Sequence, residues 1–314
     1  MLGGRNDESL NLILVIGGSG FIGQHFRDFA RGRCDVVYVL RSGAQEQLEA
    51  NTGETFIDAD SFEGAVGDQI IQQASAILYL RSASVPGTFE ANPDGELDFN
   101  ATPALRFFTR CARLNLDARV IFTSSGGAVY GARQQAPITE AQPTLPISAY
   151  GYGKMIIEDG LRLLSRSRGQ RFSILRLSNP VGRYHTNPRQ GLVPAAFHAV
   201  RTAQSLPLFG TSNVRDYVDA DDVAAALMAA ACDVSSECRT LNIGSGKGLS
   251  IAQMIKLIET TLSLTVPVKI EPARQVDVPY VILDCSNAER QLGWRASTPI
   301  SQTLLKTWLG PKSN

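Results

Sequence analysis

Short apolar runs recur through the first part of the sequence, each followed by a stretch long enough to form a helix. The runs cover residues 12–16, 36–40, 76–80, 120–123 and 172–177. They are nearly continuous rather than alternating, which is typical of parallel strands buried on both faces. Alternation of such strands with helices predicts an α/β fold, in which helices cover both faces of a doubly wound parallel sheet of the Rossmann type.

The alternation of strands and helices becomes irregular after residue 178. Several prolines between residues 180 and 207 divide the chain into short segments, and proline interrupts regular elements. We therefore predict a first unit over residues 1–178 and a smaller, mixed region over residues 179–314. Parts of residues 214–244 have the composition to return to the first sheet.

Four glycines follow the first apolar run, in the sequence VIGGSGFIGQ. A glycine inside an element costs about 0.5–1 kcal/mol relative to alanine, so the cluster indicates that something must approach the backbone. After a strand, Gly17 permits a tight turn, Gly20 admits a pyrophosphate, and Gly23 lets helix and strand pack closely. Phe21 and Ile22 would begin the helix, whose free N–H groups favour phosphate. This segment predicts dinucleotide binding.

The second apolar run ends in VVYVLRSGA, which places Arg41 where NAD-selective sites usually carry a carboxylate for the ribose 2′-hydroxyl. A guanidinium presents a planar fork of donors to phosphate oxygens, and Ser42 adds a hydroxyl. The sequence therefore favours NADP as the cofactor. If Arg41 is only a solvated residue at a strand end, NAD stays open.

A second group of candidate functional residues lies in SAYGYGKMIIEDGLRLL, where Tyr150 and Lys154 are four residues apart. On a helix, this spacing places both side chains on one face. Tyrosine has an ordinary pKa near 10, so making it a base near pH 7 requires about 4 kcal/mol of preferential stabilisation of the phenolate. A nearby ammonium group acts in that direction. The pair is a candidate acid/base site.

Composition and charge exclude several classes of protein. The 30 basic and 30 acidic residues cancel, so no overall field attracts nucleic acid or an anionic membrane. No apolar run reaches the ~20 residues of a membrane span, and we expect no signal peptide in the first residues, because they contain no apolar segment. The five cysteines form no C-x-x-C pair, and the three histidines lack ligand spacing. We expect a cytoplasmic protein without a metal site.

Ordered motifs between residues 12 and 309 make the chain resemble the extended short-chain dehydrogenase/reductase family. The nearest branch is that of nucleotide-sugar epimerases and dehydratases, including enzymes like UDP-glucose/galactose 4-epimerase. The motifs are GGSGFIG, SSGGAVYG, SAYGYGK, RLSNPVG, NVRDYVDADDVA, NIGSG and DVPYVILDCSNAERQLGW. The resemblance implies a dinucleotide-binding Rossmann domain over residues 1–178 and a sugar-nucleotide-binding region over residues 179–314.

The resemblance also implies roles for individual residues. Tyr150 would be the catalytic acid/base, Lys154 would hold the nicotinamide ribose, and Asp60 would lie near the adenine. The residues around the diphosphate of the nucleotide-sugar substrate would be Asn179, Arg215 and Arg274. Discrete arginines suit this task in a chain of zero net charge, because charge-assisted bidentate bonds give both affinity and orientation.

A homodimer is a further implication of the resemblance. Residues 98–114 and 149–166 would pair with the same segments of a second copy as a four-helix interface. Apolar residues of the second segment could make that contact or could face the chain's own sheet. They are Ile156, Ile157, Leu161 and Leu164.

One position departs from the family pattern. Family members usually carry a serine or threonine four residues before the tyrosine of VYG, and here that position is Gly126. Ser125 is adjacent and could present its hydroxyl to the substrate, or it could only end the strand. We retain Ser125 as a third catalytic candidate.

The same segment limits which reactions of the family we expect this protein to catalyse. Dehydratases and decarboxylases of the family usually have an acid after the hydroxyl residue, whereas here Gly126, Gly127 and Ala128 follow Ser125. We therefore expect an NAD(P)-dependent epimerase that transfers hydride at the sugar C4 through a transient ketone. The alternatives are an NADPH-dependent 4-keto-sugar reductase and, in another class, a non-catalytic NADP-binding sensor or scaffold.

Overall fold

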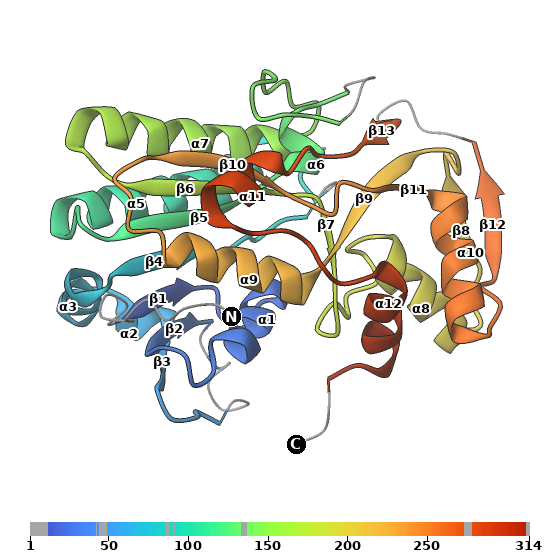
Figure 1. Ribbon diagram of the computed structural model, residues 1–314, viewed down its shortest axis with the longest axis horizontal. Helices are drawn as coiled ribbons and strands as arrows, with labels where there is room; N and C mark the ends of the chain where they lie inside the picture. The colour runs from blue at the N-terminus through green and yellow to red at the C-terminus, as the bar shows by residue number, and fades with distance from the viewer. Residues whose placement is uncertain are drawn as a thin grey trace.

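The computed structural model describes residues 12–41, 43, 49–85, 88–90, 92–132, 137–272 and 278–311. Its main element is a seven-stranded parallel sheet with the order β10-β6-β5-β4-β1-β2-β3 (Figure 1). The strands are β1 (Ile13–Ile16), β2 (Val36–Leu40), β3 (Glu54–Asp58), β4 (Ala76–Tyr79), β5 (Arg119–Ser125), β6 (Phe172–Leu177) and β10 (Arg239–Ile243). This order is that of a doubly wound Rossmann-type sheet, so the predicted fold class is confirmed.

Both faces of this sheet are buried, which explains why its strands are continuously apolar. Ile13 and Val15 of β1 lie in one hydrophobic cluster, whereas Leu14 and Ile16 lie in another. The first cluster is covered by α1 (Phe21–Ala30), α9 (Ala220–Ala231) and α11 (Ser286–Leu292). The second is covered by α2 (Ala59–Phe62), α3 (Ala65–Gln73), α5 (Thr102–Leu114) and α7 (Ala149–Arg168).

Two strands of the large sheet were not in the predicted set of five runs. The edge strand β3 has the sequence ETFID and is only partly buried, so it lacks a continuous apolar signal. The other is β10, which comes from the second half of the chain and pairs in parallel with β6. The return of β10 agrees with the expectation that parts of residues 214–244 join the first sheet, whereas the place of β3 depends on its pairing with β2.

The remaining strands form smaller sheets. The strand β9 (Val214–Asp219) lies between β11 (Gly248–Ser250) and β13 (Tyr280–Val281) and also pairs with β7 (Asn179–Val181). A separate pair joins β8 (Leu206–Phe209) to β12 (Val268–Glu271). A third hydrophobic cluster lies among α8 (Leu192–Thr202), α10 (Ile251–Leu262) and α12 (Ile300–Leu309). Figure 1 shows these elements beside the large sheet.

The parallel arrangement decides where a site can form. The carboxyl ends of parallel strands meet at one edge of the sheet, and ligands of such folds bind in the crevice outside that edge. The short helices α4 (Asp94–Glu96) and α6 (Gly126–Val129) and the π-helix η2 (Leu97–Ala101) lie in the connections that follow β4 and β5. No helix among the described residues is long and apolar enough to cross a membrane.

Candidate functional site

The glycine turn joins β1 to α1 and leaves no room for side chains. Gly17 has a φ of +95°, and a Cβ there would lie 2.9 Å from the backbone nitrogen of Arg81. A Cβ on Gly23 would lie 2.5 Å from the carbonyl oxygen of Gly18. Gly20 is the N-cap of α1 and makes no side-chain capping bond, and the first N–H groups of a helix have no partner within the helix. This geometry fits a dinucleotide diphosphate.

The next two strands place charged residues at the same edge. Arg41 follows β2 directly and its side chain is exposed, and Asp60 lies in the first turn of α2, just after β3. Leu40 is paired with Asp58 in the β2–β3 register, so the two strand ends lie side by side. Ser42, predicted to act beside Arg41, lies outside the described residues.

Tyr150 and Lys154 lie in the first two turns of α7. Ser148 caps this helix by accepting a hydrogen bond from the backbone nitrogen of Gly151. Lys154 is buried, and its Nζ donates to the carbonyl oxygen of Thr123, 3.0 Å away, at the end of β5. The same Nζ lies 5.6 Å from the ring centroid of Tyr150. The helix therefore brings the two side chains together beside the carboxyl end of β5.

The protonation equilibria differ from the sequence-based expectation. The pKa of Tyr150 is raised to about 12, mainly by burial and also by Glu96, while a hydrogen bond with Ser125 acts in the opposite direction. Burial lowers the pKa of Lys154 to about 8, while Glu96 and Glu158 act in the opposite direction. Among the described residues, desolvation outweighs any stabilisation of the phenolate by Lys154. A bound ligand must supply more positive charge before Tyr150 becomes a base near neutrality.

Ser125 is the last residue of β5 and is hydrogen-bonded to Tyr150. Its neighbour Gly126 has no space for a side chain, since a Cβ there would lie 2.7 Å from Leu283 Cδ1 and 3.3 Å from the carbonyl oxygen of Arg176. Leu283 is completely buried. The position that holds a hydroxyl in the family is therefore blocked by a side chain from the C-terminal region, whereas the preceding hydroxyl reaches Tyr150.

This packing predicts the effect of restoring the family residue. We expect Gly126→Ser to lower the free energy of unfolding by about 1–3 kcal/mol, because it overpacks a closed region, and to give no gain in turnover. Urea unfolding would measure the loss of stability. Gly127→Ser is the matched control, since the atom nearest to its Cβ is 3.9 Å away. Equal stability of the two variants would contradict the predicted clash.

The predicted diphosphate ligands lie on two adjacent strands. Asn179 begins β7 and its Nδ2 donates to the carbonyl oxygen of Asp216, at 2.9 Å. Arg215 lies on β9, which pairs with β7, and its Nη1 donates to the carbonyl oxygen of Val214, at 2.9 Å. Arg274 lies outside the described residues. Tertiary pairing thus brings two of the three residues to one small sheet.

Sequence reasoning missed the acidic groups around Tyr150 and Lys154. Glu96 from α4 and Glu158 from α7 are buried, with exposed fractions of 1% and 0%. Glu158 accepts hydrogen bonds from both Arg176 and Ser124. In the sequence, the acidic residues of DGELD and IIEDG look like ordinary solvent-exposed residues of a helix. The signal that could have found Glu96 is the glycine at position 153, which has no local reason to occupy a helix interior.

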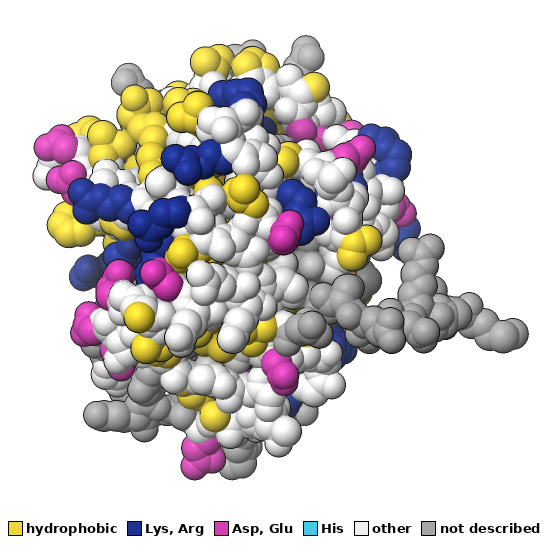
Figure 2. Space-filling model, turned by 90° about the vertical axis from the view of Figure 1, so that its left-hand side faces the viewer, with side chains coloured by type: hydrophobic (Ala, Val, Ile, Leu, Met, Phe, Trp, Pro, Cys, Tyr) yellow, Lys and Arg dark blue, Asp and Glu magenta, His cyan; other side chains and the backbone are white. Residues whose placement is uncertain are grey.

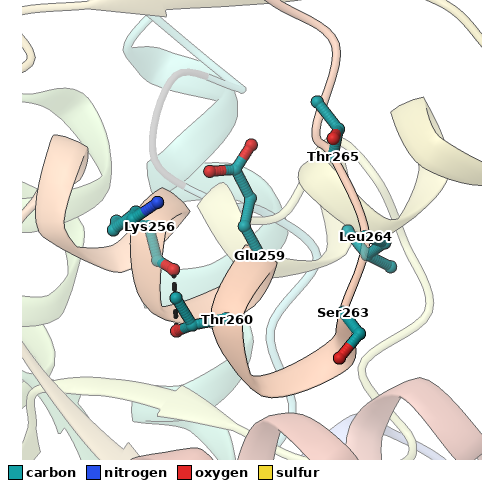
Figure 3. A pocket seen from close by; sticks show the side chains of 6 residues that line it. All are labelled: Lys256, Glu259, Thr260, Ser263, Leu264 and Thr265. Carbon is teal, nitrogen blue, oxygen red and sulfur yellow. Dashed lines mark hydrogen bonds between the residues drawn. The ribbon is translucent and has the colours of Figure 1, made fainter.

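A surface hollow at the end of α10 is not a candidate functional site. Figure 3 shows the hollow at the end of α10, lined by Lys256, Glu259, Thr260, Ser263, Leu264 and Thr265. Thr260 Oγ1 donates to the carbonyl oxygen of Lys256, and Glu259 Oε1 accepts from the backbone nitrogen of Val266. These polar groups stabilise the end of the helix. In Figure 1, the helix α10 lies away from the carboxyl edge of the large sheet.

A doubly wound sheet, a glycine turn before α1, and a tyrosine–lysine pair on one helix at the same edge define a nucleotide-binding α/β protein of the Rossmann class. The model of the NAD dependent epimerase/dehydratase family matches residues 13–244. The chain belongs to this family.

Relatives and solved structures agree with this membership. The chain is 28% identical to UDP-glucose 4-epimerase of Bacillus subtilis, with 96% of this chain and 97% of the relative aligned. It is similar to the crystal structure of Thermotoga maritima UDP-glucose 4-epimerase with UDP-glucose, with a TM-score of 0.82, 27% identity, and coverage of 95% and 97%. The Stenotrophomonas maltophilia UDP-glucose-4-epimerase, with bound NAD and formylated UDP-arabinopyranose, gives a TM-score of 0.84 at 26% identity, covering 96% and 97%.

Proposed function

We propose that this protein is an NAD(P)-dependent epimerase that inverts the configuration at C4 of a nucleotide-linked sugar, with UDP-sugars as the substrate class. The observation that carries the proposal is the pair of Tyr150 and buried Lys154 at the carboxyl end of β5, with Ser125 hydrogen-bonded to Tyr150. Relatives that are UDP-glucose 4-epimerases support the choice of reaction and substrate.

The residues of the chain have distinct tasks in this reaction. Tyr150 accepts the proton of the C4 hydroxyl. It returns the proton to the carbonyl oxygen after the keto-sugar has rotated to present its opposite face. Ser125 orients that oxygen by hydrogen bonding, and Lys154, anchored on the carbonyl oxygen of Thr123, binds the ribose and adds positive charge. A bound nicotinamide cofactor would supply the hydride acceptor. Orientation of reacting groups contributes up to about 7–11 kcal/mol to such catalysis.

The binding residues divide between the two parts of the chain. We assign the cofactor diphosphate to the turn of Gly17, Gly20 and Gly23, with the N–H groups of Phe21 and Ile22, and the adenine to the neighbourhood of Asp60. We assign the substrate diphosphate to Asn179, Arg215 and Arg274. Residues 1–178 would then bind the cofactor, and residues 179–314 would bind the sugar nucleotide.

The direct experiment is a screen of the purified protein with UDP-sugars, followed by GDP-, CDP- and dTDP-sugars, with chromatographic separation of the C4 epimers. We expect interconversion of the two epimers of a UDP-sugar without net consumption of cofactor. Failure to interconvert any of these substrates would overturn the proposal.

We further propose that NADP is the preferred cofactor, because Arg41 is exposed at the end of β2 in the place of a ribose-binding carboxylate. Arg41→Ser is expected to weaken NADP binding about 10- to 100-fold, from the loss of charge-assisted bonds to phosphate, and to leave NAD binding unchanged. Calorimetric titration with each cofactor would measure both affinities. Arg33→Ser, which removes an exposed arginine before β2, is the control. Tighter binding of NAD by the unchanged protein would contradict this preference.

Arg41 also favours a second candidate activity, reduction of a nucleotide-linked 4-keto-sugar by NADPH, because a cofactor that is consumed must dissociate after each turnover. The screen separates the two functions. Interconversion by protein with retained cofactor supports the epimerase, whereas product formation that consumes added NADPH stoichiometrically supports the reductase.

We also propose a homodimer formed by η2, α5 and α7 of two copies. Ile157 and Leu161 are buried in the chain's own core, so they cannot make this contact, whereas Phe99 and Leu163 are 57% and 58% exposed. Figure 2 shows the side of the molecule where α3, α5 and α7 end, with hydrophobic side chains gathered at the upper left and basic side chains beside them. Exposed apolar patches of this kind are typical of protein interfaces.

This surface leads to a direct prediction. Leu163→Glu is expected to convert the dimer to a monomer, because a charge would be buried without a partner, and light scattering would report the mass. Val234→Glu changes a residue that is 76% exposed and should leave the mass unchanged. A monomeric wild-type protein, or a dimer that survives Leu163→Glu, would refute this interface.

A further inference from the structure

Glu96 is a buried acid that the sequence did not identify as part of the site. It lies in α4 and is 1% exposed. A Cβ built on Gly153 of α7 would lie 2.5 Å from Glu96 Cγ and 2.8 Å from Glu96 Oε1. A glycine inside a helix costs about 1 kcal/mol relative to alanine, and here its absent side chain leaves the space that Glu96 occupies. The acid is therefore packed directly against the helix turn that carries Tyr150 and Lys154.

The surroundings of Glu96 hold one carboxyl oxygen and leave the other unpaired. Oε1 accepts a hydrogen bond of 3.0 Å from Asn100 Nδ2, and this amide also donates to Ser84 Oγ. Asn100 is itself fixed by the backbone nitrogen of Ala83, which donates to Oδ1 at 2.6 Å. Oε2 is buried and has no hydrogen-bond partner among the described residues. A buried carboxyl group with one unpaired oxygen thus lies against the helix that carries Tyr150 and Lys154.

Charged and titratable groups from α7 and from the connection after β4 surround this carboxyl. From α7, Tyr150 and Lys154 interact electrostatically with Glu96, and Glu158 acts on Lys154 from the next turn. From the connection after β4, Ser84 lowers the pKa of Glu96, against the rise that burial causes. With Glu96 ionised and Lys154 protonated, these two charges cancel. Formation of the Tyr150 phenolate would then add a net negative charge to a buried region, which is unfavourable without a further cation.

We propose that Glu96 is a positioning residue for the acid/base pair, which holds Lys154 in its charged form and opposes ionisation of Tyr150 until a cationic ligand group lies beside the phenol. The role concerns the proton affinity of Tyr150 in the protein itself. Its consequence for turnover rests on the proposed epimerase function.

The test is Glu96→Gln, which keeps the shape and can still pair with Asn100 but carries no charge. In the ligand-free protein, we expect the pKa of Tyr150 to fall by about one unit, a tenfold change in the phenolate fraction at a given pH. The near-ultraviolet tyrosinate absorbance would measure it, as the difference between each protein and the same protein with Tyr150→Phe. An unchanged Tyr150 titration would overturn the proposal.

The pH profile of turnover gives a second readout. Once a bound cationic group has brought the pKa of Tyr150 below that of Lys154, activity is expected to rise with pH as Tyr150 loses its proton and to fall as Lys154 loses its own. Removing a negative charge lowers both pKa values, so both limbs should move to lower pH in Glu96→Gln. A merely structural role would lower stability and leave both limbs in place, which would also overturn the proposal.

Controls separate this inference from the proposed function. Asp94→Asn removes an exposed acid from the same short helix and should leave both readouts unchanged; a shift as large as that of Glu96→Gln would count against the proposal. If Glu96→Gln does not fold, Glu96→Asp, which keeps the charge farther away, should give a smaller shift in the same direction. Absence of turnover with every nucleotide sugar would refute the epimerase, while the tyrosinate titration would still decide the role of Glu96.

Discussion

Tyr150→Phe is expected to lower the turnover of nucleotide sugars about 10²- to 10⁴-fold, the range typical for loss of a positioned proton donor and acceptor. The change removes one oxygen from the side chain and leaves the ring in place, so cofactor affinity and melting temperature should stay close to those of the unchanged protein. Steady-state kinetics, with cofactor titration as the second measurement, would establish this pattern.

Tyr152→Phe is the matched control, because Tyr152 lies on the same helix two residues away and is 46% exposed. It should retain full activity. Comparable losses in both variants would indicate damage to α7 rather than loss of the reacting phenol. Full activity of Tyr150→Phe would remove the chemical basis of the proposed function and favour a non-catalytic role for the bound cofactor.

Glu158→Ala is expected to lower the free energy of unfolding by about 3–5 kcal/mol, the cost of leaving a buried charge without its partner. Arg176 is 3% exposed, and its Nε and Nη2 donate to the two oxygens of Glu158 at 3.0 and 2.6 Å. Ser124 donates to the same carboxylate at 2.6 Å. Urea unfolding should show a large shift of the midpoint.

Asp159→Ala provides the comparison on the next residue of the same helix. The Asp159 side chain is 66% exposed and pairs with Arg162, and exposed pairs contribute at most about 1 kcal/mol. Joint replacement, Glu158→Leu with Arg176→Met, should recover part of the lost stability, because no unpaired charge remains. If Glu158→Ala and Asp159→Ala unfold at the same urea concentration, the buried pair does not have the predicted importance.

The blocked position at Gly126 and the buried acid at Glu96 have one feature in common. Each depends on contact with a residue far away in the chain, Leu283 in one case and Gly153 in the other. In both cases, a glycine makes room for the distant side chain. A glycine in a sequence indicates that space is needed, but only the fold identifies the group that occupies it.

The sequence alone determined those features that arise from local spacing. Continuous apolar runs predicted the central strands, the glycines after β1 predicted the turn before α1, and the interval of four residues predicted that Tyr150 and Lys154 share one face of a helix. These inferences follow from the periods of strand and helix and from the conformational freedom of glycine, so they need no knowledge of distant contacts.

Only the tertiary structure decided which residues surround that pair. It placed β10 beside β6, joined Arg176 to Glu158, and set Glu96 against Gly153. It also determined that burial raises the pKa of Tyr150 while Ser125 lowers it. The physical reason is that desolvation and Coulomb interaction depend on distances through space between residues from separate elements, and a linear sequence does not contain those distances.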